Sequence, residues 1–224
     1  MKKVNFILFA ISALVMATAC SKDDPSPEQD QEEVSKAKLI FTEVAVEDHE
    51  DHVYYHEIDG VAPTTIGFNQ QGLPDENSDS HIHLTIGKTY RLALEASDFA
   101  GRPTQQTFID RADIHQAFIM GDKAGALGYV YADKDAEGKD LNVGVTGYLT
   151  VKKAADGFVL NYLLRHLNPG VKASITAQDW NNPDYAKFTG ENDLDLKVEI
   201  HPVEADHDHE HGNEGHDHED HDHE

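Results

Sequence analysis

The chain of 224 residues contains a single cysteine, Cys20, and a single tryptophan. With one thiol, no disulfide can form within the chain, so its stability must come from a packed core or from bound metal. Basic residues are also scarce, because 18 Lys and Arg stand against 42 Asp and Glu, and the net charge is -24. Such a charge repels nucleic acids and anionic lipid headgroups and attracts cations. We therefore exclude a nucleic-acid partner.

Catalytic signatures are missing as well. Neither HExxH nor GxSxG occurs, and there is no glycine-rich loop of the kind that cradles phosphates. Histidines and carboxylates could build a metallohydrolase, but no catalytic spacing supports one. The absence of any long stretch with a 3.6-residue hydrophobic period rules out a helical bundle. We expect a binding protein rather than an enzyme.

The N-terminus has the pattern of a secretory signal. Residues 1–19 combine a positive start with a short apolar run, which is too short to span a bilayer comfortably, and end in small residues before Cys20. This arrangement resembles the lipobox of bacterial lipoproteins, in which the cysteine becomes the lipidated first residue. Residues 21–24, Ser-Lys-Asp-Asp, resemble the export signal of surface lipoproteins of the Bacteroidota. We therefore expect a lipid anchor in the outer membrane and exposure at the cell surface; a periplasm-facing lipoprotein and a soluble secreted protein are the alternatives.

The C-terminus carries the strongest functional signal. Residues 206–224 read DHDHEHGNEGHDHEDHDHE and contain no hydrophobic side chain, so we expect 204–224 to be a disordered tail. Imidazole suits zinc, nickel and copper(II), and interleaved carboxylates concentrate cations. Zinc is the first choice, and a solvating acidic tail is the alternative interpretation. The expected tail ligands are His207, His209, His211, His216, His218, His221 and His223.

The middle of the chain predicts one domain over residues 37–203, behind an acidic flexible tether over 20–36. Short apolar alternations between turn residues indicate an all-β fold, a single antiparallel β-sandwich that is Ig-like or related. The expected strands are 38–46, 53–58, 82–86, 90–96, 115–120, 128–132, 143–151, 158–166 and 194–200. Long loops are expected at 59–80 and 168–193, and the one candidate helix is 107–114. Residues 133–138 are expected to form a hairpin turn rather than a calcium loop.

The stretch 89–202 resembles a group of small surface lipoproteins of the Bacteroidota. The matching pieces are Thr89-Tyr90, residues 115–118, the turn 133–135 with Gly138, residues 163–166 and residues 179–183. This resemblance covers about half of the chain. It implies a β-sandwich lipoprotein of the cell envelope, without a settled activity, and the histidine-rich tail is not a general feature of the group.

A second concentration of histidines, His49, His52 and His56, precedes a separate pair, His81 and His83. Residues two apart on a strand share a face, so His52 and His56 lie on one face and His81 and His83 on another. If the two strands pair antiparallel, three or four imidazoles meet, which is enough for zinc. A folded site of His56, His81 and His83, with His52 and His49 nearby, is therefore expected; a solvent-facing polar edge strand is the alternative.

Three further histidines lie beside apolar strands. His115 and His166 are expected to be structural, and His201 could join the tail.

Two functions follow from the patterns described above. The first is a lipoprotein that binds divalent metal, for capture or uptake, and passes it to a TonB-dependent outer-membrane receptor. The alternative is a surface ligand-binding or adhesion module for haem, a glycan or a protein, with a tail that buffers metal.

Overall fold

The computed structural model describes residues 34–50 and 52–205. The predicted signal peptide, Cys20, most of the tether and the seven tail histidines lie outside the described residues. Within those residues, no helix is long and apolar enough to cross a membrane.

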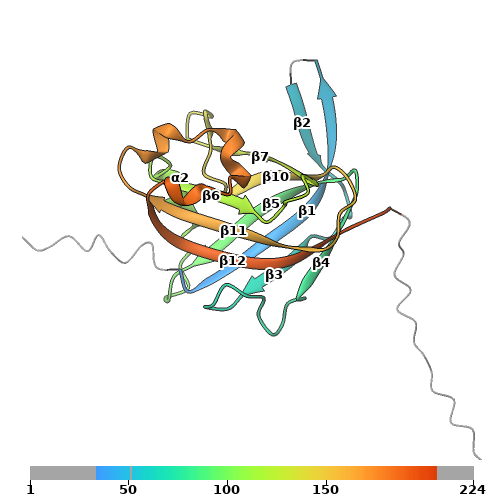
Figure 1. Cartoon of the computed structure of the whole chain (residues 1–224), viewed down its shortest axis with the longest axis horizontal. Helices are drawn as coiled ribbons and strands as arrows, with labels where there is room; N and C mark the ends of the chain where they lie inside the picture. The colour runs from blue at the N-terminus through green and yellow to red at the C-terminus, as the bar shows by residue number, and fades with distance from the viewer. Residues whose placement is uncertain (1–33, 51, 206–224) are drawn as a thin grey trace, which may run out of the picture. The chain divides into compact units, whose positions relative to one another are not determined.

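The alternating segments form two main sheets (Figure 1). The first runs β2-β1-β5-β10-β7, and β3 pairs with β1. The long strand β1 uses one edge twice, since its first half pairs with β3 and its second half with β2. The bounds are β1 Lys36–His49, β2 His52–Glu57, β3 Thr64–Phe68, β5 Thr89–Ser97, β7 Leu127–Tyr131 and β10 Thr146–Val151.

The second sheet runs β4-β12-β11-β6. All pairs in both sheets are antiparallel except β4 and β12, which are parallel. The bounds are β4 His81–Thr85, β6 His115–Met120, β11 Phe158–Leu167 and β12 Gly190–Val203. The predicted all-β sandwich is confirmed, with this one parallel pair as an exception to the antiparallel expectation.

The core lies between the two sheets, because strands such as β4, β5, β10 and β12 bury every second residue. Leu39 and Phe41 of β1 face Leu196 and Val198 of β12 in one continuous apolar cluster, and each is at most 3% exposed. Burying a side chain of this size stabilises the fold by about 1.5–3 kcal/mol. This rigid core fixes which side chains emerge at the ends and outer faces of the sheets.

The outer face of β6 and β11 is also covered. Residues 168–189, most of an expected loop, form three short 3-10 helices and pack on Phe118 and Leu163 as a second apolar cluster. The pair β6 and β11 is therefore buried on both faces near this end. The bounds of the short helices are η1 Val171–Ser174, η2 Ala177–Asn181 and η3 Tyr185–Lys187.

Smaller elements differ from expectation in informative ways. The expected loop 59–80 contains β3, and the candidate helix appears as α2, Gln105–Asp110. The predicted hairpin turn at 133–138 is confirmed, because β8 (Asp133–Lys134) pairs with β9 (Asp140–Leu141). The hairpin of β1 and β2 projects beyond the sandwich (Figure 1).

Candidate metal site

The predicted site of His56, His81 and His83 is not assembled. It required the strand of His56 to pair with the strand of His81 and His83. Instead β2 pairs with β1 in one sheet, and β4 pairs with β12 in the other. That pairing was wrong, because hydrophobic alternation indicates which face a residue occupies but not which strand lies beside it.

The hairpin histidines lie together on one exposed face. Nε2 of His49 is 3.0 Å from one carboxylate oxygen of Glu47, and Nε2 of His56 is 3.4 Å from the other. His52 is directly opposite His49 in the register. The ring of Tyr54 contacts all three imidazoles. Metal binding by this face stays a prediction.

His81 and His83 project from the outer face of β4 and meet His201 of β12, a neighbour that the sequence did not suggest for them. The tail histidines, His207 to His223, and the lipidation candidate Cys20 lie outside the described residues.

A partly buried group of ligands lies elsewhere, at the end of the second sheet. His115 begins β6, and His166, near the end of β11, is its direct cross-strand partner. Their ring centroids are 4.9 Å apart. Asp193 joins them from β12. One ligand atom from each of the three residues lies within 4.8 Å of the others, so the group could hold a metal ion.

Asp193 reaches this position through an irregularity in β12. Leu164 pairs with Leu194, but the next residue, Arg165, pairs with Asn192, so the register skips Asp193. A bulge of this kind re-aims a side chain that would otherwise alternate with its neighbours. The carboxylate of Asp193 is only 12% exposed, and His115 is fully buried.

Hydrogen bonding indicates the form of His115. Its Nδ1 lies 3.0 Å from the carbonyl oxygen of Arg111, and a carbonyl can only accept, so Nδ1 carries a proton. Nε2 then faces Oδ2 of Asp193 at 3.4 Å. Two atoms bound to one tetrahedral zinc ion are about 3.3 Å apart, so one ion could bridge this nitrogen and this oxygen.

His166 is placed to serve as a neutral ligand. Burial lowers its pKa, and the nearby charges of His115 and Arg111 lower it further, while Asp193 acts in the opposite direction. Neutral imidazole is the form that binds metal. Phe108 of α2 packs edge-on against His115, with ring centroids 5.2 Å apart, and shields this end of the group from water.

Lys172 of η1 supports the same corner. Its Nζ donates hydrogen bonds to the carbonyl oxygens of His115, at 2.5 Å, and of Asn142, at 2.6 Å. Burial lowers the pKa of Lys172 to about 7, against the charges of Asp133 and Asp113. The ammonium therefore ties the covering segment to the strand that begins at His115.

The sequence predicts a structural role for His115 and His166 and does not single out Asp193. Both histidines did lie on expected strands, yet their pairing was not readable from the sequence. The skipped register at Asp193 left no local signal. Only the paired strands bring the three residues together.

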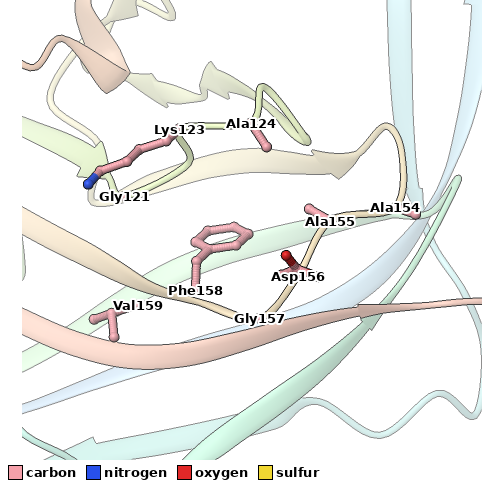
Figure 2. A pocket seen from close by; sticks show the side chains of 9 residues that line it. All are labelled: Gly121, Lys123, Ala124, Ala154, Ala155, Asp156, Gly157, Phe158 and Val159. Atoms are coloured by element: carbon pink, nitrogen blue, oxygen red, sulfur yellow. The ribbon is translucent and has the colours of Figure 1, made fainter.

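Two open pockets lie away from this group. One, of ≈ 840 Å³, has the Phe158 ring near its centre and no histidine in its lining, which is formed by Gly121, Lys123, Ala124 and residues 154–159 (Figure 2). The other, of ≈ 770 Å³, has six aromatic side chains and His52 in its lining. A scan of protein-family models finds none that matches the chain, and searches of curated proteins and of solved structures find no match either.

Proposed function

We propose that the chain is a cell-envelope lipoprotein that binds divalent transition-metal ions, with zinc as its main ligand. The observation that carries the proposal is the convergence of His115, His166 and Asp193 at the end of the second sheet. In this proposal the histidine-rich tail collects ions, and the folded domain holds one firmly.

The donor set favours zinc, nickel or copper(II) over calcium. Two imidazole nitrogens and one carboxylate oxygen suit metals of intermediate softness, whereas calcium prefers six to eight oxygens. Three protein ligands also leave a fourth tetrahedral position open for water or an incoming ligand. The hydrogen bond from Nδ1 of His115 to the Arg111 carbonyl is the kind of outer contact that orients a metal-binding ring.

Folded placement should give the domain a higher affinity than the tail. The rings of His115 and His166 are already packed, so an ion entering here orders little additional chain. A polar tail must lose backbone entropy of about 1–2 kcal/mol for each residue that it fixes around an ion. The acidic chain, with net charge -24, attracts the ions in either case.

Zinc titration by calorimetry tests the proposal. Three proteins are compared. The first is the mature chain, and the second is the tail variant, in which the seven histidines between residues 206 and 224 become glutamine. The third is the tail variant that also carries His166→Ala. We expect the tail variant to keep saturable binding and His166→Ala to remove one site from it. Lys123→Ala in the same background changes an exposed residue outside every candidate metal site, and as the control it should leave that site unchanged. A tail variant that binds no zinc would refute the proposed metal site in the domain. His115 and Asp193 would then be an ion pair without a metal.

The cellular location is proposed from the sequence alone. Cys20 follows a signal-like segment, and Lys22-Asp23-Asp24 fits export to the cell surface. We propose an outer-membrane lipid anchor there, with a TonB-dependent receptor as the onward partner. Cys20→Ala should move the protein from the membrane fraction to the soluble fraction after cell breakage. An unchanged membrane fraction would refute the anchor.

A second candidate function is supported by the aromatic pocket. His52 lies at this pocket together with stacked Tyr55 and Tyr148, whose ring centroids are 3.6 Å apart, and with Trp180. A flat aromatic ligand fits such walls, and a histidine can hold haem iron. A Soret shift on adding haemin that is lost in His52→Ala would favour haem binding, and no shift would remove this candidate.

A further inference from the structure

Three histidines meet on the outer face of the second sheet, at its β4 edge. His81 and His83 occupy alternate, exposed positions, whereas Ile82 between them is buried in the core. His201 of β12 lies directly opposite His83 in the parallel register. The backbone therefore holds all three rings on one face.

The centroid spacing of the rings is that of three imidazoles on one zinc ion, although their ligand nitrogens do not all lie within 4.8 Å of one another, so the exposed rings must turn before they share an ion. The centroids lie 5.1 Å apart for His81 and His83, 5.2 Å for His81 and His201, and 5.4 Å for His83 and His201. A zinc–nitrogen bond of about 2.0–2.1 Å puts each ring centroid about 3.2 Å from the metal. At a tetrahedral angle the centroids would then be about 5.2 Å apart.

A carboxylate stands beside the three rings. Glu199 is opposite His81 in the register, and its Oε1 lies 3.1 Å from Nε2 of His201. Two atoms bound to the same tetrahedral zinc ion are about 3.3 Å apart, so the pair can share one ion after a small adjustment. Oγ of Ser80 lies 3.4 Å from Nδ1 of His81, which leaves Nε2 of that ring for the metal.

We propose that His81, His83, His201 and Glu199 form a second divalent-metal site on the surface, with zinc as the ligand. This goes beyond the proposed function, because the site is separate from the buried one. Asp193 and His201 are eight residues apart on β12, a span of about 26 Å along an extended strand. Zinc can therefore bind to each site, or be lost from it by a substitution, without a change at the other.

Exposure gives this site a different task from the buried one. His81 and His83 are open to solvent, and the side chain of His201 is 36% exposed, so an ion can arrive and leave without any opening of the core. In contrast, His115 is fully buried. The surface site is suited to exchange ions with donors and acceptors outside the molecule.

The test is NMR of the histidine ring nitrogens of the tail variant during zinc titration. We expect the ring nitrogens of His81, His83 and His201 to shift together and to saturate. Substituting one ligand, as in His83→Ala, should weaken binding at the other two rings at least about 10-fold, since even outer-shell contacts change metal affinity by this amount. His56→Ala, which removes an exposed histidine outside the cluster, is the matched control and should change nothing at these rings.

Two outcomes would overturn the surface site. One is that the three rings stay unshifted at excess zinc. The other is that His83→Ala leaves the zinc affinity at His81 and His201 as it was. His166→Ala separates this result from the buried site: it should remove zinc-induced shifts at His115 and leave those of the surface rings. Because His83 is exposed, its substitution should leave the melting temperature of the metal-free protein unchanged, which confirms that the variant is folded.

Discussion

Lys172 offers a sharp test of how the domain is held together beside the buried histidines. Lys172 belongs to η1, and its ammonium donates hydrogen bonds to the carbonyl oxygens of His115 and Asn142. Burial lowers the pKa of Lys172 from 10.5 to about 7. The unfolded chain therefore binds more protons than the folded chain between about pH 7 and pH 10.5. Because stability rises with pH wherever the unfolded state holds the extra proton, the free energy of unfolding should rise across this range.

The size of the effect follows from the two pKa values. At 1.36 kcal/mol per pH unit, the whole difference corresponds to about 5 kcal/mol, of which about 3 kcal/mol is recovered between pH 7 and 9.5. Above this range Tyr129, Tyr131 and Tyr162 act in the opposite sense, because burial raises the pKa of each phenol above 10. The pH window of the measurement therefore ends at 9.5.

Urea unfolding followed by circular dichroism, with a chelator present, measures this dependence. Wild type should gain about 3 kcal/mol from pH 7 to 9.5. Lys172→Met keeps an unbranched side chain without the charge, so its stability should be nearly flat over the same range. Lys123→Met changes an exposed lysine and should behave as wild type. A Lys172→Met protein with the slope of wild type would refute the assignment.

Two further predictions concern packing, each checked by urea unfolding. Gly72 has φ +71°, and a Cβ there would lie 1.8 Å from the carbonyl oxygen of Asp195, so Gly72→Ala should cost more than about 2 kcal/mol. Gly60→Ala, at φ +79° with nothing within 4 Å, should cost about 1 kcal/mol, and equal costs would contradict the contact. Tyr162→Phe should cost about 1–3 kcal/mol, because the buried hydroxyl donates to the carbonyl oxygen of Gly144 at 2.8 Å, which would lose its donor. A cost near zero would show that this bond contributes nothing.

Much of the fold was predictable from alternation alone. The nine expected strands are all present within a few residues of their bounds. Most of them carry a buried row such as Leu160, Tyr162 and Leu164, whereas β2 buries no residue. Strand β3 was missed because only Ile66 and Phe68 of its five residues face the core, with Gly67 between them. So short an alternation, set among turn residues, gives little signal.

The candidate site was less predictable, for a different physical reason. The two-residue period places a histidine on a face, but the neighbouring strand depends on contacts far apart in the sequence. His56 was therefore paired with His81 and His83, whereas His201 is their actual neighbour. Asp193 depends on a register irregularity that no residue pattern announced.

A crystal structure of the tail variant soaked with zinc, with anomalous diffraction collected at the zinc absorption edge, decides whether the three residues hold an ion. We expect an anomalous peak about 2.0–2.2 Å from Nε2 of His115, a ring nitrogen of His166 and a carboxylate oxygen of Asp193. The contradicting result is the absence of a peak at this position, with Nε2 of His115 donating a proton directly to Asp193.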